Sequence, residues 1–272
     1  MKERLRALVA AAPGDAERRA VVREYLQAHI LHSLQDGGAF RVWAFCGGTA
    51  LRFLYAIPRY SEDLDFSLAA PDANPNFAPL ISRVEAAFRA EGYAVSLKPA
   101  GKRAVASAFV RLPGLLHELD LSPRPTQTLS IKVEVDTNPP AGAGLETTLV
   151  RRHFTLNLLH HDRASLLAGK LHALLSRPYT KGRDLYDLLW YLSDPAWPAP
   201  NLPFLNAALA QTHYRGRPLT AASWARRVGA RLRAVDWTIA RRDVLPFLER
   251  PAEIELLSLK HLAALLKRRE VS

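Results

Sequence analysis

Cysteine is almost absent from this chain. Cys46 is the only one among 272 residues, so no disulfide can form within the chain and a cysteine-rich zinc site is excluded. Nine histidines are present, but His160 and His161 have only Asp162 beside them and no further ligand at metal-binding spacing. We therefore expect no zinc site, and we interpret Cys46, at the end of an apolar run, as a small core residue.

Long apolar runs are also missing. No stretch approaches the roughly 18 residues that a membrane-spanning helix needs. The first twelve residues contain basic residues and a short alanine stretch, as a signal peptide would. The apolar part is too short for a signal peptide, and Glu3 interrupts it. We therefore expect a mature, cytoplasmic protein without a membrane partner. A hydrophobic share of 49% beside 23% charged residues is typical of a globular fold and argues against disorder.

Acidic residues are few compared with basic ones. The chain has 37 lysines and arginines against 26 acidic residues, a formal net charge of +11. Such a charge attracts polyanions, although it can also serve solubility alone. The excess is concentrated in residues 215–242, where Asp236 is the only acid, and this clustering favours RNA as a partner. The arginines that we assign to RNA binding are Arg226, Arg227, Arg231 and Arg241. Trp224 and Trp237 could stack on bases, but we favour a place in the core for them.

The periodicity of apolar residues divides the chain into two parts. Helices are predicted over residues 16–34, 49–55 and 80–89, and strands over residues 40–45, 63–68, 93–97, 105–112 and 129–135. After Asp162 only helices are predicted, over residues 164–176, 182–192, 203–211, 220–233 and 254–267. This order indicates an α+β fold with a helical C-terminal half. We expect two domains, residues 1–162 and 163–272.

A glycine pair stands between a predicted strand and a predicted helix. Gly47 and Gly48 allow the backbone to approach a ligand, and the following helix offers unpaired N–H groups suited to phosphate. Thr49 can add a hydroxyl donor. The chain has no Walker-type Gly-Lys-Ser/Thr loop. A glycine pair by itself is more often a simple turn, so other residues must support a phosphate site.

Two aspartates follow this turn in the next predicted strand. Residues two apart in a strand point to the same face, so Asp63 and Asp65 lie side by side, while Leu64 and Phe66 face the core. Neighbouring carboxylates repel each other, and a divalent cation such as Mg²⁺ offsets that repulsion. The alternative is a pair of exposed acids on an edge strand.

A third carboxylate is available in the strand predicted over residues 129–135. Ile131, Val133 and Val135 form its apolar face, and the opposite face is polar. Glu134 lies in the middle of that polar face, so we favour it over Asp136 as a partner for the two aspartates. The alternative interpretation is that this polar face is simply the solvent-exposed side of a half-buried strand, with no role in a site.

These motifs, taken in order, resemble a known family. The chain carries Gly-Gly-Thr at residues 47–49, Arg-x-Ser-x-Asp-x-Asp at 59–65, the carboxylate strand, Lys170 in a leucine-rich helix, and Lys-x-Arg-Asp-x-x-Asp at 181–187. Together they resemble the AbiEii-type nucleotidyltransferases, a branch of the DNA polymerase beta superfamily that includes toxins of type IV toxin–antitoxin and phage-exclusion systems. The resemblance covers residues 40–192, and we identify no family motif after residue 195.

The resemblance implies a polymerase-beta-like core and a reaction. A nucleoside monophosphate passes from a nucleoside triphosphate (NTP) to an acceptor, with Mg²⁺ or Mn²⁺ held by the three predicted carboxylates. The residues expected to bind the nucleotide are Gly47, Gly48, Thr49, Ser61 and Lys170. Asp184 resembles the family's late acidic site residue and is expected to orient Lys170 or to contact a substrate. We interpret Asp187 as a structural carboxylate, and Lys181 and Arg183 either touch phosphate or balance these acids.

The acceptor is open to several interpretations. Among the resembling toxins the tRNA 3′ end is a known target, and this is our first hypothesis, together with a toxin role and a cognate antitoxin. A related enzyme could instead modify a protein or a small molecule, which the basic helical half disfavours. A non-catalytic RNA- or protein-binding module on the same scaffold is a third alternative, which the intact acids and Lys170 disfavour.

Overall fold

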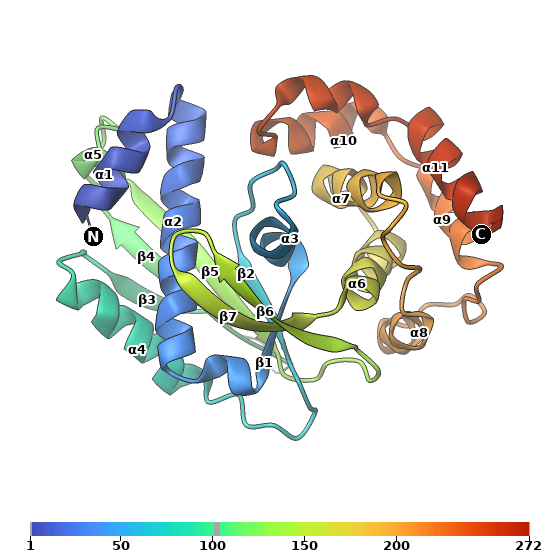
Figure 1. Cartoon of the computed structure of the whole chain (residues 1–272), viewed down its shortest axis with the longest axis horizontal. Coiled ribbons are helices and arrows are strands. Elements are labelled where there is room, and N and C mark those ends of the chain that lie inside the picture. The colour runs from blue at the N-terminus through green and yellow to red at the C-terminus, as the bar shows by residue number, and fades with distance from the viewer. Residues whose placement is uncertain (1, 101–103, 272) are drawn as a thin grey trace. The chain divides into compact units, whose positions relative to one another are not determined.

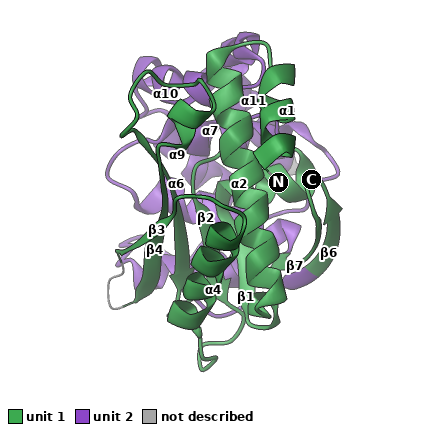
Figure 2. Cartoon of the chain, turned by 90° about the vertical axis from the view of Figure 1, so that its left-hand side faces the viewer, with its two compact units in different colours: residues 1–56, 60–139, 147–160 green, residues 57–59, 140–146, 161–272 purple. Residues whose placement is uncertain are grey.

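The computed structural model describes residues 2–100 and 104–271, and the chain forms two compact units (Figure 2). Unit 1 comprises residues 1–56, 60–139 and 147–160, and unit 2 comprises residues 57–59, 140–146 and 161–272. The division into domains 1–162 and 163–272 stays a prediction. None of the helices in the described residues has the length and apolar character to cross a membrane.

A seven-stranded mixed sheet runs through the described part of the chain in the order β3-β4-β5-β2-β1-β7-β6. Its strands are β1 Trp43–Cys46, β2 Leu64–Leu68, β3 Ser96–Pro99, β4 Val105–Pro113, β5 Thr128–Asp136, β6 Leu145–Arg151 and β7 Thr155–His161. The central strand β2 is antiparallel to β1 and parallel to β5. The glycine turn directly follows β1, Asp63 directly precedes β2 and Asp65 lies in β2, so these predicted site residues lie at the middle of the sheet.

The alternation predicted for β5 is present. Leu129, Ile131, Val133 and Val135 are buried, while the residues between them are partly exposed. Such a strand buries one face and leaves the other polar, because successive side chains point in opposite directions. The helices of unit 1 are α1 Lys2–Ala11, α2 Asp15–Asp36, α3 Gly47–Tyr55, α4 Phe77–Ala90 and α5 Leu115–Glu118. Helices α2 and α4 pack against each other and on the sheet (Figure 1).

Unit 2 is largely helical. Its helices are α6 Arg163–Ser176, α7 Gly182–Ser193, α8 Leu202–Gln211, α9 Trp224–Leu232, α10 Trp237–Val244 and α11 Leu259–Val271. Three of them begin at capping residues, because the side chains of Asp162, Asn201 and Asp236 accept hydrogen bonds from the first turns of α6, α8 and α10. Helix α7 packs against α6, α10 and α11, so it forms the centre of this unit.

The structure confirms the predicted α+β fold with a helical C-terminal half and corrects several elements. The strand predicted over residues 40–45 starts only at Trp43, because Ala39–Arg41 forms a 3-10 turn. The helix predicted over residues 254–267 is a 3-10 segment, Pro251–Leu256, followed by α11. Strands β6 and β7 and helices α1, α5 and α10 were not predicted.

Candidate active site

Gly47 brings the start of α3 against an aspartate of β2. Its φ of +73° is a conformation that L side chains rarely adopt, and a Cβ there would lie 2.4 Å from Asp65 Oδ2. Cys46 pairs with Asp65 in the β1–β2 ladder. The Asp65 carboxylate therefore lies at the N-terminal turn of α3, where the helix dipole favours negative charge. Only glycine fits this position without moving the carboxylate.

The register between β2 and β5 decides which third carboxylate lies next to Asp65. The two strands are parallel, and Asp65 is directly paired with Glu134. Directly paired residues point to the same face of a sheet. Asp136 pairs instead with Ser67, and its Oδ1 accepts a hydrogen bond of 2.9 Å from the backbone N of Asn138. Burial raises the pKa of Asp136, and the Asn138 hydrogen bond opposes this.

Glu134 and Asp136 therefore have different surroundings. Lys132, two residues earlier on the same face of β5, forms an ion pair of 2.6 Å with Glu134 Oε1. Glu134 is thus paired with a cation and adjoins Asp65, whereas Asp136 closes the turn at the strand end. The geometry favours Glu134 as the third carboxylate.

The side chains of Thr49 and Gln27 hold the chain that leads into β2. Thr49 is fully buried, and its hydroxyl donates a hydrogen bond to the backbone carbonyl of Asp63. The amide of Gln27 donates a hydrogen bond of 3.1 Å to the backbone carbonyl of Ser61. Asp63 itself lies directly before β2 and is partly exposed. The observed role of Thr49 is structural, and a contact from Thr49 or Ser61 to a triphosphate stays a prediction.

The carboxylates of unit 1 fit a magnesium ion that a substrate helps to hold. Among the described residues, no three histidine, cysteine or acidic side chains form a group that could hold a metal by themselves. Mg²⁺ does not require such a group, since it commonly takes one or two carboxylates and completes its shell with substrate phosphates and water. The directly paired Asp65 and Glu134, with Asp63 two residues before, supply oxygen ligands of this kind.

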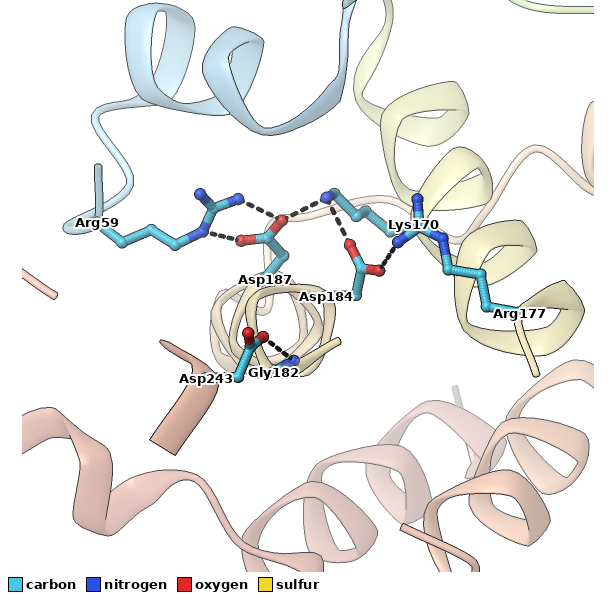
Figure 3. A network of polar contacts seen from close by, with 7 residues as sticks. All are labelled: Arg59, Lys170, Arg177, Gly182, Asp184, Asp187 and Asp243. Carbon is cyan, nitrogen blue, oxygen red and sulfur yellow. Dashed lines mark hydrogen bonds and ion pairs between the residues drawn. The ribbon is translucent and has the colours of Figure 1, made fainter. Parts of the chain in front are cut away.

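Lys170 of unit 2 lies in a network of charged side chains (Figure 3). Its Nζ contacts Asp187 Oδ2 at 2.7 Å and Asp184 Oδ1 at 3.0 Å. Arg177 donates to the second oxygen of Asp184, and Arg59 binds both oxygens of Asp187, with its second contact at 2.7 Å. Three cations therefore alternate with two carboxylates across α6, α7 and residue Arg59.

Burial and pairing determine the protonation of this network. Burial by itself lowers the pKa of Lys170, but the charges of Asp187 and Asp184 outweigh it and raise that pKa. Burial would raise the pKa of Asp187, yet Arg59 and Lys170 hold it below its usual range. Asp187 is fully buried and Arg59 is 1% exposed, so both charges depend on each other. Lys170 is consequently a fixed cation at neutral pH.

Sequence reasoning found part of this network. Asp184 was expected to orient Lys170 or to contact a substrate; its Oδ1 accepts a hydrogen bond from Lys170, and both roles stay predictions. The structural role expected for Asp187 agrees with its burial beneath Arg59 and Lys170. The contribution of Arg59 was missed, although this residue opens the Arg-x-Ser-x-Asp-x-Asp motif. No sequence signal pointed to Arg177.

The start of α7 is packed closely on α10. A Cβ at Gly182 would lie 2.0 Å from the backbone oxygen of Ala240, and the Gly182 N donates a hydrogen bond of 2.7 Å to Asp243 Oδ2. The Arg183 guanidinium lies 4.2 Å from the centre of the Phe247 ring. Burial and the neighbouring Arg183 charge lower the pKa of Lys181. Asp243 and Phe247 thus hold this end of α7, and the predicted phosphate contacts of Lys181 and Arg183 stay predictions.

The four arginines assigned to RNA divide into two pairs. Arg231 donates to the backbone oxygens of Leu174 and Arg177 at 3.2 and 3.3 Å. Arg241 donates to the backbone oxygen of Leu257 at 2.8 Å. These two guanidinium groups cap and join helices inside unit 2, whereas Arg226 and Arg227 are exposed on α9. Trp224 is buried, as its preferred core position predicts, whereas Trp237 is only partly buried.

Comparisons with known proteins identify the family. No curated protein matches the chain. MenT4, a nucleotidyltransferase toxin from Mycobacterium tuberculosis H37Rv, has a similar structure, with a TM-score of 0.62 and 20% identity over 97% of this chain and 88% of that one. JHP933 from Helicobacter pylori has a TM-score of 0.53 and 18% identity over 93% of this chain and 92% of its own. At these identities the two structures show the fold.

The family model described as "Nucleotidyl transferase AbiEii toxin, Type IV TA system" matches residues 29–264, which is most of the chain. The match includes the glycine turn, both aspartates of the signature, the β5 carboxylates and the Lys170 network. This chain therefore belongs to the AbiEii family of nucleotidyltransferase toxins of type IV toxin–antitoxin systems.

Proposed function

We propose that this nucleotidyltransferase adds a nucleoside monophosphate to the 3′ end of a tRNA. Membership of the family makes an NTP its substrate and an antitoxin its partner. The observation that supports the site best is the pairing of Asp65 with Glu134 beside the Gly47 turn. Two carboxylates thus lie beside the N-terminal turn of α3, whose dipole favours phosphate, and this supports nucleotidyl transfer at that point.

The proposed reaction is an in-line displacement. The 3′ hydroxyl of the acceptor releases its proton to solvent, and its oxygen forms a new bond to the α-phosphorus of the NTP. The bond from that phosphorus to the oxygen bridging to the β-phosphate breaks, and pyrophosphate leaves with the electron pair. Asp63, Asp65 and Glu134 would hold Mg²⁺ or Mn²⁺, which neutralises charge on the attacking and leaving oxygens when it is bound. Gly47 and Gly48 bind phosphate through the backbone N–H groups at the start of α3.

Lys170 serves as a phosphate-binding cation in this proposal. Two carboxylates hold its ammonium group in place, and they also keep it protonated. Asp184 positions Lys170, and Arg177 in turn fixes Asp184. Arg59 and Asp187 support the network from inside unit 2, because both are too deeply buried to contact a substrate.

An RNA acceptor is supported by charge. The net charge of +11 attracts polyanions, and the exposed Arg226 and Arg227 lie on a helix whose first turn has no acidic residue. A small acceptor would need no such surface. We do not assign Arg231 and Arg241 to the RNA, because their guanidinium groups are bonded to backbone oxygens.

A labelling experiment tests this proposal. Purified protein is incubated with Mg²⁺, total bacterial tRNA and each α-labelled NTP separately, beside an Asp65→Asn variant whose folding is checked by circular dichroism. Label in tRNA with the intact protein and none with the variant is the expected result. Label in a protein or a small molecule in place of tRNA would refute the acceptor, and equal labelling by the variant would refute the site.

A further inference from the structure

A pocket of about 630 Å³ lies within unit 2 between the end of helix α6, helix α9 and the loop that joins α8 to α9. The loop that joins α8 to α9 and the first turns of α9 form most of its wall. Four arginines line it, namely Arg215, Arg217, Arg226 and Arg227. None of the described residues around it is acidic. The pocket is thus a concave site with one sign of charge.

Hydrogen bonds at both ends fix the loop that carries Arg215 and Arg217. The Tyr214 N donates to the backbone oxygen of Leu209 at 3.0 Å. At the other end, the Asn206 side chain accepts from the Leu219 N at 2.7 Å and donates to the Leu219 oxygen at 2.9 Å. These hydrogen bonds restrict the conformation of the loop, and such restriction lowers the entropy cost of binding a ligand.

An aromatic ring lies among the arginines. The guanidinium of Arg227 is 5.4 Å from the centre of the Tyr214 ring. The same ring lies over Gly216, where an added Cβ would meet ring atoms at 2.3 to 2.4 Å. Glycine at this position thus allows the ring to fold over the loop. A half-buried tyrosine beside arginines is a surface on which an unpaired base can stack.

Among the residues that the structure describes, no carboxylate forms an ion pair with these four guanidinium groups. Like charges in one pocket repel each other, and a bound anion relieves this repulsion. Arginine binds phosphate through two parallel hydrogen bonds, so four arginines suit a ligand with several phosphates.

The pocket shares helix α6 with Lys170. Leu175 lines the pocket and lies five residues after Lys170, about 7.5 Å further along the helix axis. Arg231 of α9 also holds the carbonyls of Leu174 and Arg177, and Arg177 binds Asp184. The same short segment thus supports both the pocket wall and the carboxylate that positions Lys170.

We infer that this arginine pocket binds the phosphate backbone of a single-stranded part of the acceptor RNA, with a base stacked on Tyr214. The inference rests on the proposed function, because it identifies where that RNA is held away from the reacting end. Free phosphate or an acidic polypeptide would also meet the arginines, but neither would use the tyrosine ring. RNA is the ligand that uses both features.

Equilibrium binding of tRNA to the full chain without any NTP tests the pocket, since no transfer then occurs. Two pocket variants are compared, Arg215→Gln with Arg217→Gln, and Arg226→Gln with Arg227→Gln. The control is Arg233→Gln with Arg242→Gln, which removes two exposed arginines outside the pocket and gives the same net charge. Binding is measured over a range of salt concentrations.

Each pocket variant should bind tRNA at least about tenfold more weakly at low salt, with the slope of log K against log salt reduced by about 1.4. Tyr214→Ala should weaken binding without changing the slope, and the control should bind nearly as the intact protein does. Equal weakening in pocket and control variants would overturn the inference, as would intact protein that binds no tRNA. Loss of binding to polyglutamate with tRNA binding retained would assign the pocket to an acidic protein instead.

The same proteins in the labelling experiment separate the two proposals. If the intact protein labels tRNA while the pocket variants bind tRNA normally, the pocket inference fails and the proposed function stands. If tRNA binds through the pocket but no nucleotide is transferred to it, the inference stands and the proposed function fails.

Discussion

Arg59 and Asp187 are a pair whose charges are removed from water together. Arg59→Met would leave the buried carboxylate of Asp187 with the Lys170 contact that Figure 3 shows, and breaking one side of such a pair costs about 3 to 5 kcal/mol of stability. The double variant Arg59→Met with Asp187→Leu should recover much of this loss. Urea unfolding measures both. A single variant as stable as the intact protein would contradict the assigned role of Arg59.

Glu24 of α2 is a second buried charge, and it makes stability depend on pH. It contacts Arg52 at 2.6 Å and Arg152 at 2.8 Å, with His153 at 3.4 Å. Burial alone would raise its pKa, but the His153 hydrogen bond and the two arginine charges outweigh this and lower the pKa from 4.5 to about 2. Because the folded-state pKa is the lower one, the stabilisation is present above pH 4.5 and disappears as the pH falls towards 2.

The difference between the unfolded and folded pKa values of Glu24 corresponds to about 3 kcal/mol of unfolding free energy. Urea unfolding at pH 6 and at pH 3 should show about 2 kcal/mol of this loss, because the folded carboxylate is still mostly ionised at pH 3. Glu24→Gln should be less stable than the intact protein at pH 6, and its stability should change less as the pH falls. The same slope in the variant and the intact protein would show that other carboxylates cause the acid sensitivity.

Among the helices and strands, the start of α3 restricts its sequence most, because only glycine fits at residue 47. Gly47→Ala would place a methyl group against Asp65 at a positive φ, so we expect a loss of activity of about a hundredfold with about 1 kcal/mol of stability lost. Gly169→Ala is the matched control. It lies in α6 beside Lys170, a Cβ there meets no atom within 4 Å, and alanine should stabilise the helix by about 0.5 to 1 kcal/mol.

Single-turnover transfer rates and urea unfolding of the two alanine variants provide the comparison. The account requires that Gly47→Ala lose far more activity than stability. Similar activity in both variants would mean that the close approach of α3 to Asp65 does not matter for catalysis.

Local patterns predicted some elements and not others. Alternation in residues 128–136 decides which side chains of β5 face the core, so the exposed face of Glu134 could be predicted. Strand β6 has almost no buried residue, and α10 is short with only Ala240 and Val244 buried, so neither has a strong apolar pattern. Asp236 is a capping signal for α10 that could have been used.

For the whole chain, the order of the motifs along the sequence predicted more about family and fold than any single motif did. The succession of motifs predicted the family and the α+β fold with its helical half, and the family model over residues 29–264 confirms the family. The direct pairing of Asp65 with Glu134 was not predictable from local pattern, because it depends on the register of two strands far apart in sequence. The bond from Arg59 to Asp187 likewise joins residues that only the fold brings together.

The measurement that tests the central claim most directly compares two neighbouring carboxylates of β5. Glu134→Gln and Asp136→Asn each remove one negative charge, and asparagine keeps an oxygen for the hydrogen bond from Asn138. Under single-turnover conditions Glu134→Gln should slow nucleotide transfer about a thousandfold, equivalent to about 4 kcal/mol, while Asp136→Asn changes the rate only a few-fold. A large loss in Asp136→Asn with normal transfer by Glu134→Gln would contradict the site built on the Asp65–Glu134 pair.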